Sequence, residues 1–320
     1  MQISLSITLP EDFRRVDFLA FHQRDNQMLA ERWDTTDDST QCFDKGIIWN
    51  SMPSRLAFNF SVQNQVEIVL EIDSGRKKIN TEQTQQQLQK LAAHMLGLNQ
   101  PTTEFEAFAA KHKDIKKLIA KQSGLRVPQA ASPFEAISWA IIGQQISLGA
   151  ATSLRRKLIQ RAGIQHSSGI YCYPQPEQIL VLTEDDLRAC SFSATKAKTL
   201  LALANVAQKG ELPLQVWLDD FWNGNTLDAE TIYAQLIAIR GIGPWTIHYA
   251  LLRGFGWMDG SLHGDVAVRR NLQNLLTAQK KYSGAEKISA AETELWLAGF
   301  SPWRALVAAH LWAMQKADGY

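Results

Sequence analysis

The sequence contains few cysteines and no long hydrophobic run. Its three cysteines, Cys42, Cys172 and Cys190, lie far apart in a chain of 320 residues. This spacing fits neither a disulfide framework nor a metal cluster, and it is typical of a reducing compartment. No early apolar stretch has the layout of a signal peptide, and no run approaches the roughly eighteen apolar residues of a membrane span. We therefore expect a soluble protein of a reducing cytosol or nucleoid that is not exported and has no membrane association.

An excess of charge is also absent. The 33 Lys and Arg residues against 32 Asp and Glu give a formal net charge of +1, which argues against a protein that coats nucleic acid nonspecifically. The segment from Arg240 to the end contains nine basic and six acidic residues, so its formal net charge is +3. Such a mild bias suits a narrow footprint on phosphates. Nothing in the sequence indicates an oligomer, and a monomer is the default expectation.

Two parts of the chain have different periodicity. Alternation of apolar and polar residues predicts strands over 2–9, 42–50, 55–62 and 65–72, and helical spacing predicts helices over 11–22, 81–97 and 103–122. Helical spacing dominates the remainder of the chain. The predicted fold class is α+β, with a small N-terminal antiparallel sheet domain over residues 1–98 and a mostly α-helical region over residues 99–320.

The chain is organised around the stretch 236–272. An apolar helix ends there at Gly241-Ile242-Gly243-Pro244, and a second apolar helix begins at Trp245. The two glycines allow a tight turn and expose backbone N–H groups, and proline suits the first turn of a helix. This predicts a helical hairpin whose second N-terminus can hold a phosphate.

Two further motifs accompany the hairpin. Asp265 follows Trp245 by twenty residues and precedes an apolar-basic run. An aspartate there is either the cap of the next helix or a catalytic acid, and the local pattern leaves both open. The second motif is Gly143-Gln144-Gln145-Ile146-Ser147. Adjacent glutamines are expensive to bury in an apolar segment, so we expect an exposed break between two helices.

The hairpin 239–246 followed at this interval by Asp265 resembles the helix-hairpin-helix DNA glycosylase superfamily, in particular its AlkA-type branch, 3-methyladenine DNA glycosylase II. The resemblance implies two helical subdomains with an active-site cleft between them. Bifunctional members carry a Schiff-base lysine where this chain has Trp245, and tryptophan cannot attack a sugar as an amine does. The four-cysteine run that holds an iron–sulfur cluster in endonuclease III relatives is also absent.

The resemblance assigns roles to several residues. Asp265 becomes the catalytic acid, and Trp245, Tyr249, Trp312 and Phe18 become the base pocket. For Phe18 and Trp312, burial in a core is the competing interpretation, because an aromatic residue on a helix is usually buried. Ten tryptophans in the chain nevertheless suit a cleft that stacks flat bases.

The resemblance also implies a DNA-binding surface, with Gln145 at the place of the side chain that fills the gap left by an extruded nucleotide. The DNA-contacting residues would be Gln144, Gln145, Arg240, Gly241, Ile242, Gly243 and Thr246. Backbone carbonyls of Ile237, Ile239 and Ile242 form a candidate site for a structural monovalent cation. No cofactor is required.

The predicted function is that of a monofunctional DNA glycosylase. It would hydrolyse the N-glycosidic bond of alkylated purines, of the 3-methyladenine and 7-methylguanine type, flipped out of damaged duplex DNA. Two alternatives stay open. One is a DNA-structure-binding protein that kept the hairpin without the chemistry, and the other is a glycosylase for deaminated or mismatched bases.

Overall fold

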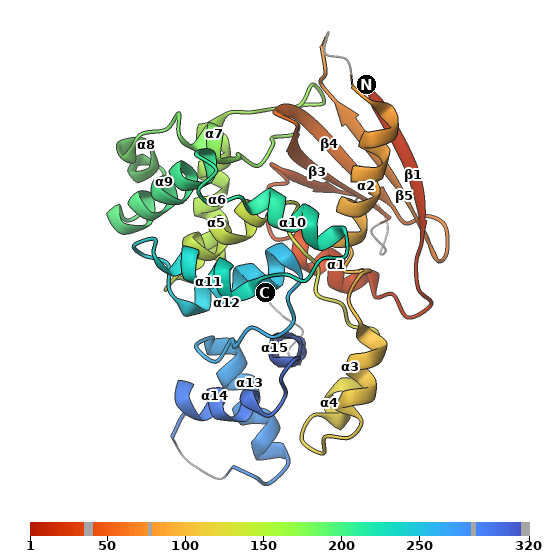
Figure 1. The fold of residues 1–320 in the computed structure, drawn as a ribbon, viewed down its shortest axis with the longest axis vertical. Coiled ribbons are helices and arrows are strands. Elements are labelled where there is room, and N and C mark those ends of the chain that lie inside the picture. Colours follow the sequence, from red (N-terminus) through yellow and green to blue (C-terminus); the bar gives the residue numbers. More distant parts are fainter. Residues whose placement is uncertain (35–40, 76–78, 283–285, 315–320) are drawn as a thin grey trace.

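The protein has an α+β fold, as its sequence predicts (Figure 1). The computed structural model describes residues 1–34, 41–75, 79–282 and 286–314, so the last six residues of the predicted helical region lie outside the described residues. Within this part of the chain, no helix has the length and apolar content needed to cross a membrane.

The N-terminal part is an antiparallel sheet covered by helices. Its five strands have the order β1-β5-β4-β3-β2, and every neighbouring pair is antiparallel. The strands are β1 (Gln2–Thr8), β2 (Glu31–Trp33), β3 (Cys42–Trp49), β4 (Met52–Asn59) and β5 (Gln65–Ile72), and the helices are α1 (Arg15–His22) and α2 (Thr81–Met95). The helix α2 lies across one face of the sheet (Figure 1). Leu88 and Leu91 of α2 share a buried cluster with Leu56 and Ile68 of the sheet.

The remaining elements in the described part of the chain are helical. They are α3 (Thr102–Ala109), α4 (Lys116–Ala120), α5 (Pro133–Gly143), α6 (Leu148–Ala162), α7 (Pro176–Ile179), α8 (Glu184–Ala189), α9 (Ala194–Gln208), α10 (Leu214–Trp222), α11 (Ala229–Ile237), α12 (Pro244–Ala250), the π-helical turn η1 (Leu251–Phe255), α13 (Val266–Ala278), α14 (Ala290–Ala298) and α15 (Arg304–Trp312). The predicted break between α5 and α6 is present. The single helix predicted over 103–122 is wrong, because the chain turns between α3 and α4 so that Phe105 and Ile115 reach the same core.

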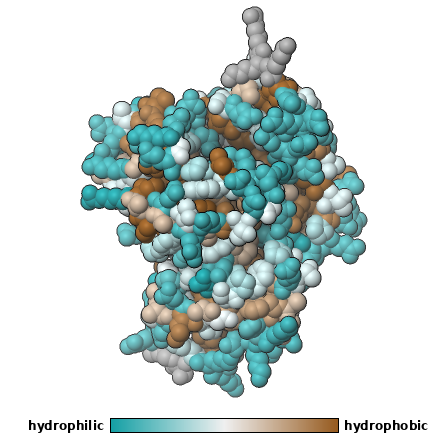
Figure 2. All heavy atoms as spheres, in the orientation of Figure 1, coloured by the Kyte–Doolittle hydropathy of each residue, from teal (hydrophilic) through white to brown (hydrophobic). Residues whose placement is uncertain are grey.

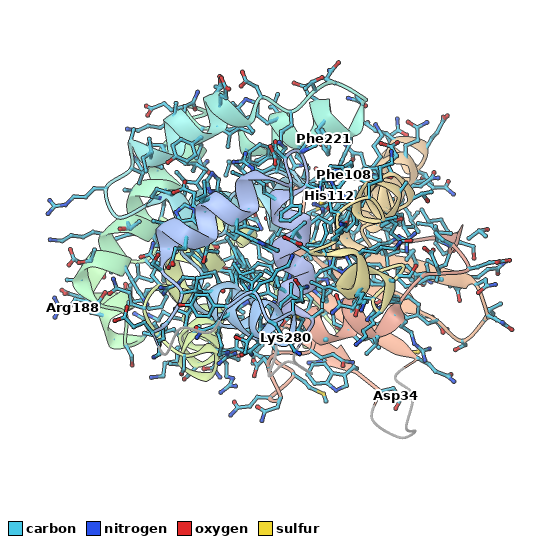
Figure 3. The ribbon with its side chains drawn as sticks, turned by 90° about the horizontal axis from the view of Figure 1, so that it is seen from below. Asp34, Phe108, His112, Arg188, Phe221 and Lys280 are labelled. Carbon is cyan, nitrogen blue, oxygen red and sulfur yellow. The ribbon has the colours of Figure 1, made fainter. Side chains whose placement is uncertain are left out.

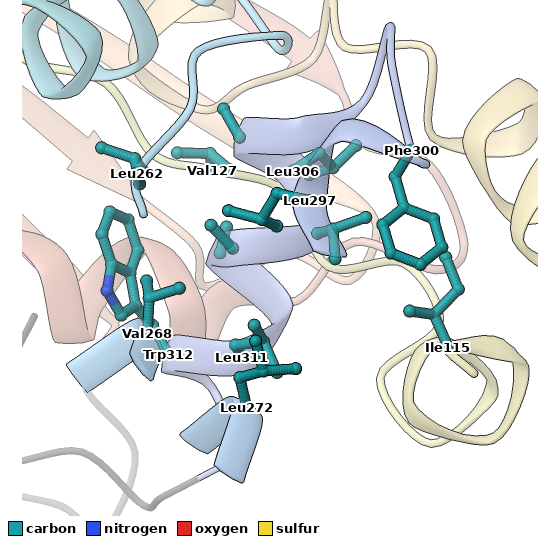
Figure 4. Packing of buried hydrophobic residues seen from close by; sticks show 14 of the residues in the cluster. Ile115, Val127, Leu262, Val268, Leu272, Leu297, Phe300, Leu306, Leu311 and Trp312 are labelled. Carbon is teal, nitrogen blue, oxygen red and sulfur yellow. The ribbon is translucent and has the colours of Figure 1, made fainter. Parts of the chain in front are cut away.

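Two large buried clusters lie in the described part of the helical region. One, which includes Ile141, Leu200 and Leu236, lies among the helices from α5 to η1. The other joins α3 and α4 to α13–α15, and Figure 4 shows Ile115 and Phe300 packed beside Leu297 and Leu306 of this cluster. On the face shown in Figure 2, hydrophobic residues appear as separate spots among hydrophilic ones. Most large apolar side chains in the described part of the chain are buried in the core clusters.

A buried ionic network holds the sheet against the helical region. Nζ of Lys45, on β3, donates to Glu31 at 2.6 Å and to Glu135 of α5 at 2.7 Å. Arg155 of α6 donates to both carboxylates. Burial alone would raise the pKa of Glu31, but the charges of Arg155 and Lys45 hold it far below its usual value. Because each buried charge is paired, this network can persist in a low dielectric, whereas removing one partner would be strongly destabilising.

Candidate functional site

The predicted hairpin is formed by α11 and α12. Gly241 has φ of +96°, and a Cβ on it would lie 2.1 Å from Oγ1 of Thr199. That hydroxyl donates to the Arg240 carbonyl at 2.9 Å, so Thr199 fastens α9 to the turn. Gly243 is the N-cap of α12, and Pro244 takes the first helical position. The turn therefore depends on glycine at position 241 for steric reasons.

The glutamine pair lies beside the hairpin. Nε2 of Gln144 donates to the Gly241 carbonyl at 3.0 Å and to Oγ1 of Thr246 at 2.9 Å. Thr246 is buried, and its hydroxyl holds the loop through this hydrogen bond. Gln145 is exposed, has φ of +57° and lines the cleft described below. Gln144 thus fixes the loop against the hairpin, and Gln145 is presented at its rim.

The other residues of the predicted DNA surface differ in their exposure to solvent. Arg240 is exposed, whereas the side chain of Ile242 is buried in the core, so only its backbone can reach a ligand. The Ile242 N–H donates to the Ile239 carbonyl at 3.0 Å, and Ile237 is 41% exposed. Among the described residues, no group of three or more His, Cys, Asp or Glu side chains is arranged to hold a metal ion. The monovalent-cation site at the carbonyls stays a prediction.

A cleft of about 770 Å³ opens between the glutamine loop, the hairpin and the start of α13. Its lining residues include Trp139, Gln144, Trp245, Tyr249, Asp265 and Val266. Its volume matches that of a pocket for a drug-sized ligand, which is large enough for one nucleotide. The cleft therefore brings together the hairpin, the loop and the acid that lie far apart in the sequence.

Asp265 is both a helix cap and a wall of this cleft. Its Oδ1 accepts from the backbone N–H groups of Ala267 and Val268 at 2.9 and 3.0 Å, and from Nε1 of Trp312 at 3.2 Å. Its Oδ2 accepts from Nε1 of Trp245 at 3.1 Å. Only 5% of Asp265 is exposed. Four N–H donors thus hold the carboxylate in one orientation.

The structure places two of the four residues predicted for the base pocket at the cleft. Trp245 and Tyr249 line the cleft, and their ring centroids lie 5.4 Å apart. Trp312 is only 6% exposed and belongs to a core cluster, where it lies beside Leu262 and Val268 (Figure 4). Its contribution to the site is the N–H group that holds the carboxylate. The aromatic wall of the cleft is therefore smaller than the sequence suggests.

The prediction that Phe18 lines the pocket is wrong. Phe18 is 1% exposed, and its ring lies 5.4 Å from that of Phe43 and 5.1 Å from that of Phe58. Phe43 and Phe58 belong to the sheet. The face of α1 that carries Phe18 therefore packs onto the strands and away from the cleft. Two cleft residues that sequence reasoning did not assign to the site are Arg24, which follows α1, and Trp139 of α5.

The hairpin, the cleft and the fixed carboxylate define a helix-hairpin-helix protein of the DNA base-excision class. A family model described as HhH-GPD superfamily base excision DNA repair protein matches residues 138–297, half of the chain. The chain belongs to this superfamily. The resemblance carried by the hairpin and Asp265 is thereby confirmed.

Two curated relatives and one solved structure agree with this assignment. DNA-3-methyladenine glycosylase of Bacillus subtilis is 27% identical over 224 residues, which cover 69% of this chain and 71% of the relative. DNA-3-methyladenine glycosylase 2 of Escherichia coli is 28% identical over 199 residues, which cover 61% of this chain and 62% of the relative. A 3-methyladenine DNA glycosylase from Archaeoglobus fulgidus has the same fold, with a TM-score of 0.74, 22% identity, and coverage of 96% of this chain and 97% of that one.

Proposed function

We propose that this protein is a monofunctional DNA glycosylase that removes alkylated purines, of the 3-methyladenine and 7-methylguanine type, from duplex DNA. The carboxylate of Asp265, fixed by two indole N–H groups and two backbone N–H groups in the wall of the cleft, carries this proposal. We also propose that it acts as a monomer, which is the default expectation from the sequence. The names of the two curated relatives support the substrate class.

The base must leave the duplex before its glycosidic bond can be reached. The hairpin would hold the backbone next to the damaged nucleotide, and the exposed Gln145 would fill the gap in the stack. Trp245 and Tyr249 would then face the extruded base in the cleft. An alkylated purine with positive charge is attracted to such electron-rich rings by about 1–2 kcal/mol per contact when desolvated.

Hydrolysis needs negative charge close to C1′ of the sugar. As the bond to the base breaks, the bonding pair leaves with the base and positive charge develops on the sugar. The Asp265 carboxylate stabilises this charge, and it accepts a proton as water adds to C1′. Because its orientation is fixed before the reaction, little reorganisation is needed. This scheme uses no cofactor.

The same geometry supports hydrolysis without lyase chemistry. A lyase of this superfamily would need an amine that forms a Schiff base with the sugar. Trp245 occupies the position after the hairpin, and no lysine is found among the residues that line the cleft. Borohydride added during turnover should therefore trap no covalent complex with DNA.

The proposal is tested by base release from matched duplexes. Each duplex would carry N3-methyladenine, N7-methylguanine, hypoxanthine or uracil at one position, and freed base would be measured at equal enzyme concentration. Release of the two alkylpurines is expected. Binding to all four duplexes with release from none would instead support a DNA-structure-binding protein without chemistry.

The Asp265→Asn variant removes the negative charge of the side chain and keeps its role as the N-cap of α13. Asparagine still accepts from Ala267 and Val268, so α13 keeps its cap, but the charge that faces the sugar is lost. Excision should fall by about two or more orders of magnitude while DNA binding survives. Asp228→Asn is the matched control, because Asp228 caps α11 in the same way and is exposed. Unchanged excision by Asp265→Asn would remove this residue from the mechanism.

A further inference from the structure

The glutamine loop, residues 143–147, connects α5 to α6 with an uncommon backbone. Gln145 has φ of +57°, a region that residues other than glycine seldom adopt. Such a conformation persists only where surrounding contacts hold it. A Cβ on Gly143 would meet no atom within 4 Å, so the space around the start of the loop is open. The conformation that presents Gln145 therefore depends on hydrogen bonds from other segments.

Lys196 of α9 holds the end of the helix that precedes this loop. It is half-buried, and its Nζ donates to the Ile142 carbonyl at 2.7 Å. Ile142 lies in the last turn of α5, where carbonyl groups have no partner within the helix. A positive charge is favourable at this end of a helix. The hydrogen bond therefore fixes the point at which the chain leaves α5 and enters the loop.

The same helix also supports the hairpin. Thr199 follows Lys196 by one turn on the same face of α9, and its Oγ1 donates to the Arg240 carbonyl at 2.9 Å. Nε2 of Gln144 donates to the Gly241 carbonyl at 3.0 Å, which joins the loop to the hairpin directly. The loop and the hairpin are therefore bound both to each other and to α9. In this arrangement, Lys196 supplies the contact between α9 and the loop side.

A second lysine on α9 provides a comparison. The side chain of Lys198 is 70% exposed, and its Nζ lies 4.0 Å from a carboxylate oxygen of Glu184 on α8. Lys196 and Lys198 thus share a helix and a charge, but Lys196 contacts α5 whereas Lys198 points toward α8. Any effect that is particular to Lys196 can therefore be separated from the loss of one positive charge on α9.

We propose that Lys196 is a positioning residue that fixes the glutamine loop so that Gln145 enters the duplex as the damaged nucleotide leaves. This inference rests on the proposed glycosylase function. Extrusion costs free energy because the nucleotide unstacks and unpairs, and a side chain that fills the vacated space offsets part of this cost. Without Lys196, the loop would hold Gln145 in the filling position for a smaller fraction of the time. Extrusion would then suffer, whereas cleavage of the glycosidic bond would not.

The test compares one lesion in two DNA contexts. For each variant, kcat/KM for release of 7-methylguanine would be measured on a fully paired duplex and on a duplex in which the lesion lies unpaired in a bulge. In the bulge, no orphan base and no gap remain for Gln145 to fill. Lys196→Met should lower release from the paired duplex about tenfold and change release from the bulge by less than about threefold. Lys196→Arg keeps a donor for the Ile142 carbonyl and should retain most of the release.

A double-mutant cycle shows whether Lys196 acts through Gln145. Gln145→Ala should cause the same selective loss on the paired duplex, and adding Lys196→Met to it should cause little further loss. Lys198→Met is the matched control. Arg188→Met is a second control, since Arg188 is exposed on α8 at the periphery of the molecule (Figure 3). Both controls should release the base from both substrates as the native protein does.

Three results would overturn the inference and leave the proposed function intact. They are native release from the paired duplex by Lys196→Met, an equal loss on both substrates, and an effect that adds in full to that of Gln145→Ala. An equal loss with a salt dependence of binding that is smaller by about one phosphate contact would show that Lys196 binds the DNA backbone. Native protein that releases 7-methylguanine from neither substrate would instead overturn the proposed function. Thermal unfolding of each variant checks that the fold is retained.

Discussion

Gly241 and Gly243 stand two residues apart in one turn, but the structure constrains them differently. A Cβ on Gly241 would lie 2.1 Å from Oγ1 of Thr199, and its φ of +96° is rarely adopted by other residues. Gly243 has an extended backbone with φ of −115°, and a Cβ on it would meet no atom within 4 Å. We therefore predict that Gly241→Ala destabilises the fold, whereas Gly243→Ala impairs DNA binding alone.

The expected loss for Gly241→Ala has two parts. An alanine forced into this backbone region costs about 1–3 kcal/mol, and displacement of Thr199 loses its hydrogen bond to the Arg240 carbonyl, worth about 1 kcal/mol. The free energy of unfolding, measured in urea, should fall by about 2–4 kcal/mol. Thr199→Ala removes the clash and the same hydrogen bond, so the double variant should lose less than the sum of the single variants. Strict additivity would refute this steric reasoning.

Gly243→Ala tests whether the turn faces DNA. The free energy of unfolding should change by less than about 1 kcal/mol, because alanine is a somewhat poorer N-cap than glycine. Affinity for duplex DNA, measured by fluorescence anisotropy, should fall about tenfold, since the new methyl group occupies the space where a phosphate would approach the backbone N–H groups. Native affinity in this variant would show that the turn is not the DNA anchor.

Two further predictions concern buried side chains. Trp312→Phe keeps most of the ring packing but removes the N–H donor to Asp265, so kcat should fall about tenfold or more with little change in KM, and an unchanged kcat would contradict a positioning role. Burial lowers the pKa of His94 and of His310 from 6.5 to about 3. Because the unfolded chain binds these protons below pH 6.5 and the fold does not, stability that is complete above pH 6.5 should be lost as the pH falls toward 3. Urea unfolding at pH 5 should show ~4 kcal/mol less stability than at pH 7, and equal values would refute this account.

The elements with clear periodicity could be predicted from the sequence. The alternation over 65–72 gives β5 with its observed bounds, and the paired glutamines locate the break between α5 and α6. The strand β2 escapes prediction because three residues are too few to show alternation. The turn between α3 and α4 could not be predicted for another reason. No proline or glycine interrupts the predicted helix, and the turn follows from packing against α13–α15.

The site could be predicted where one local motif carries it, and not where distant segments meet. The hairpin and Asp265 lie within one stretch of chain, so their spacing alone indicates the site. The position of Phe18 could not be predicted, because the direction in which its side chain points depends on how α1 packs on the sheet. Arg24 lines the cleft beside Asp25, which Arg156 binds from more than a hundred residues away, and no local sequence pattern indicates such a contact.

The two interpretations of Asp265, as a helix cap and as a catalytic acid, do not exclude each other. Capping uses Oδ1, which accepts from two backbone N–H groups of α13, whereas Oδ2 accepts from the indole N–H of Trp245. A cap places a carboxylate at the positive end of a helix and holds it still, and a catalytic carboxylate also needs to be ionised and fixed in place. In the proposed mechanism the cap also holds the catalytic carboxylate in place, and what separates Asp265 from an ordinary cap such as Asp228 is the pair of tryptophans, Trp245 and Trp312, that donate to it from other helices.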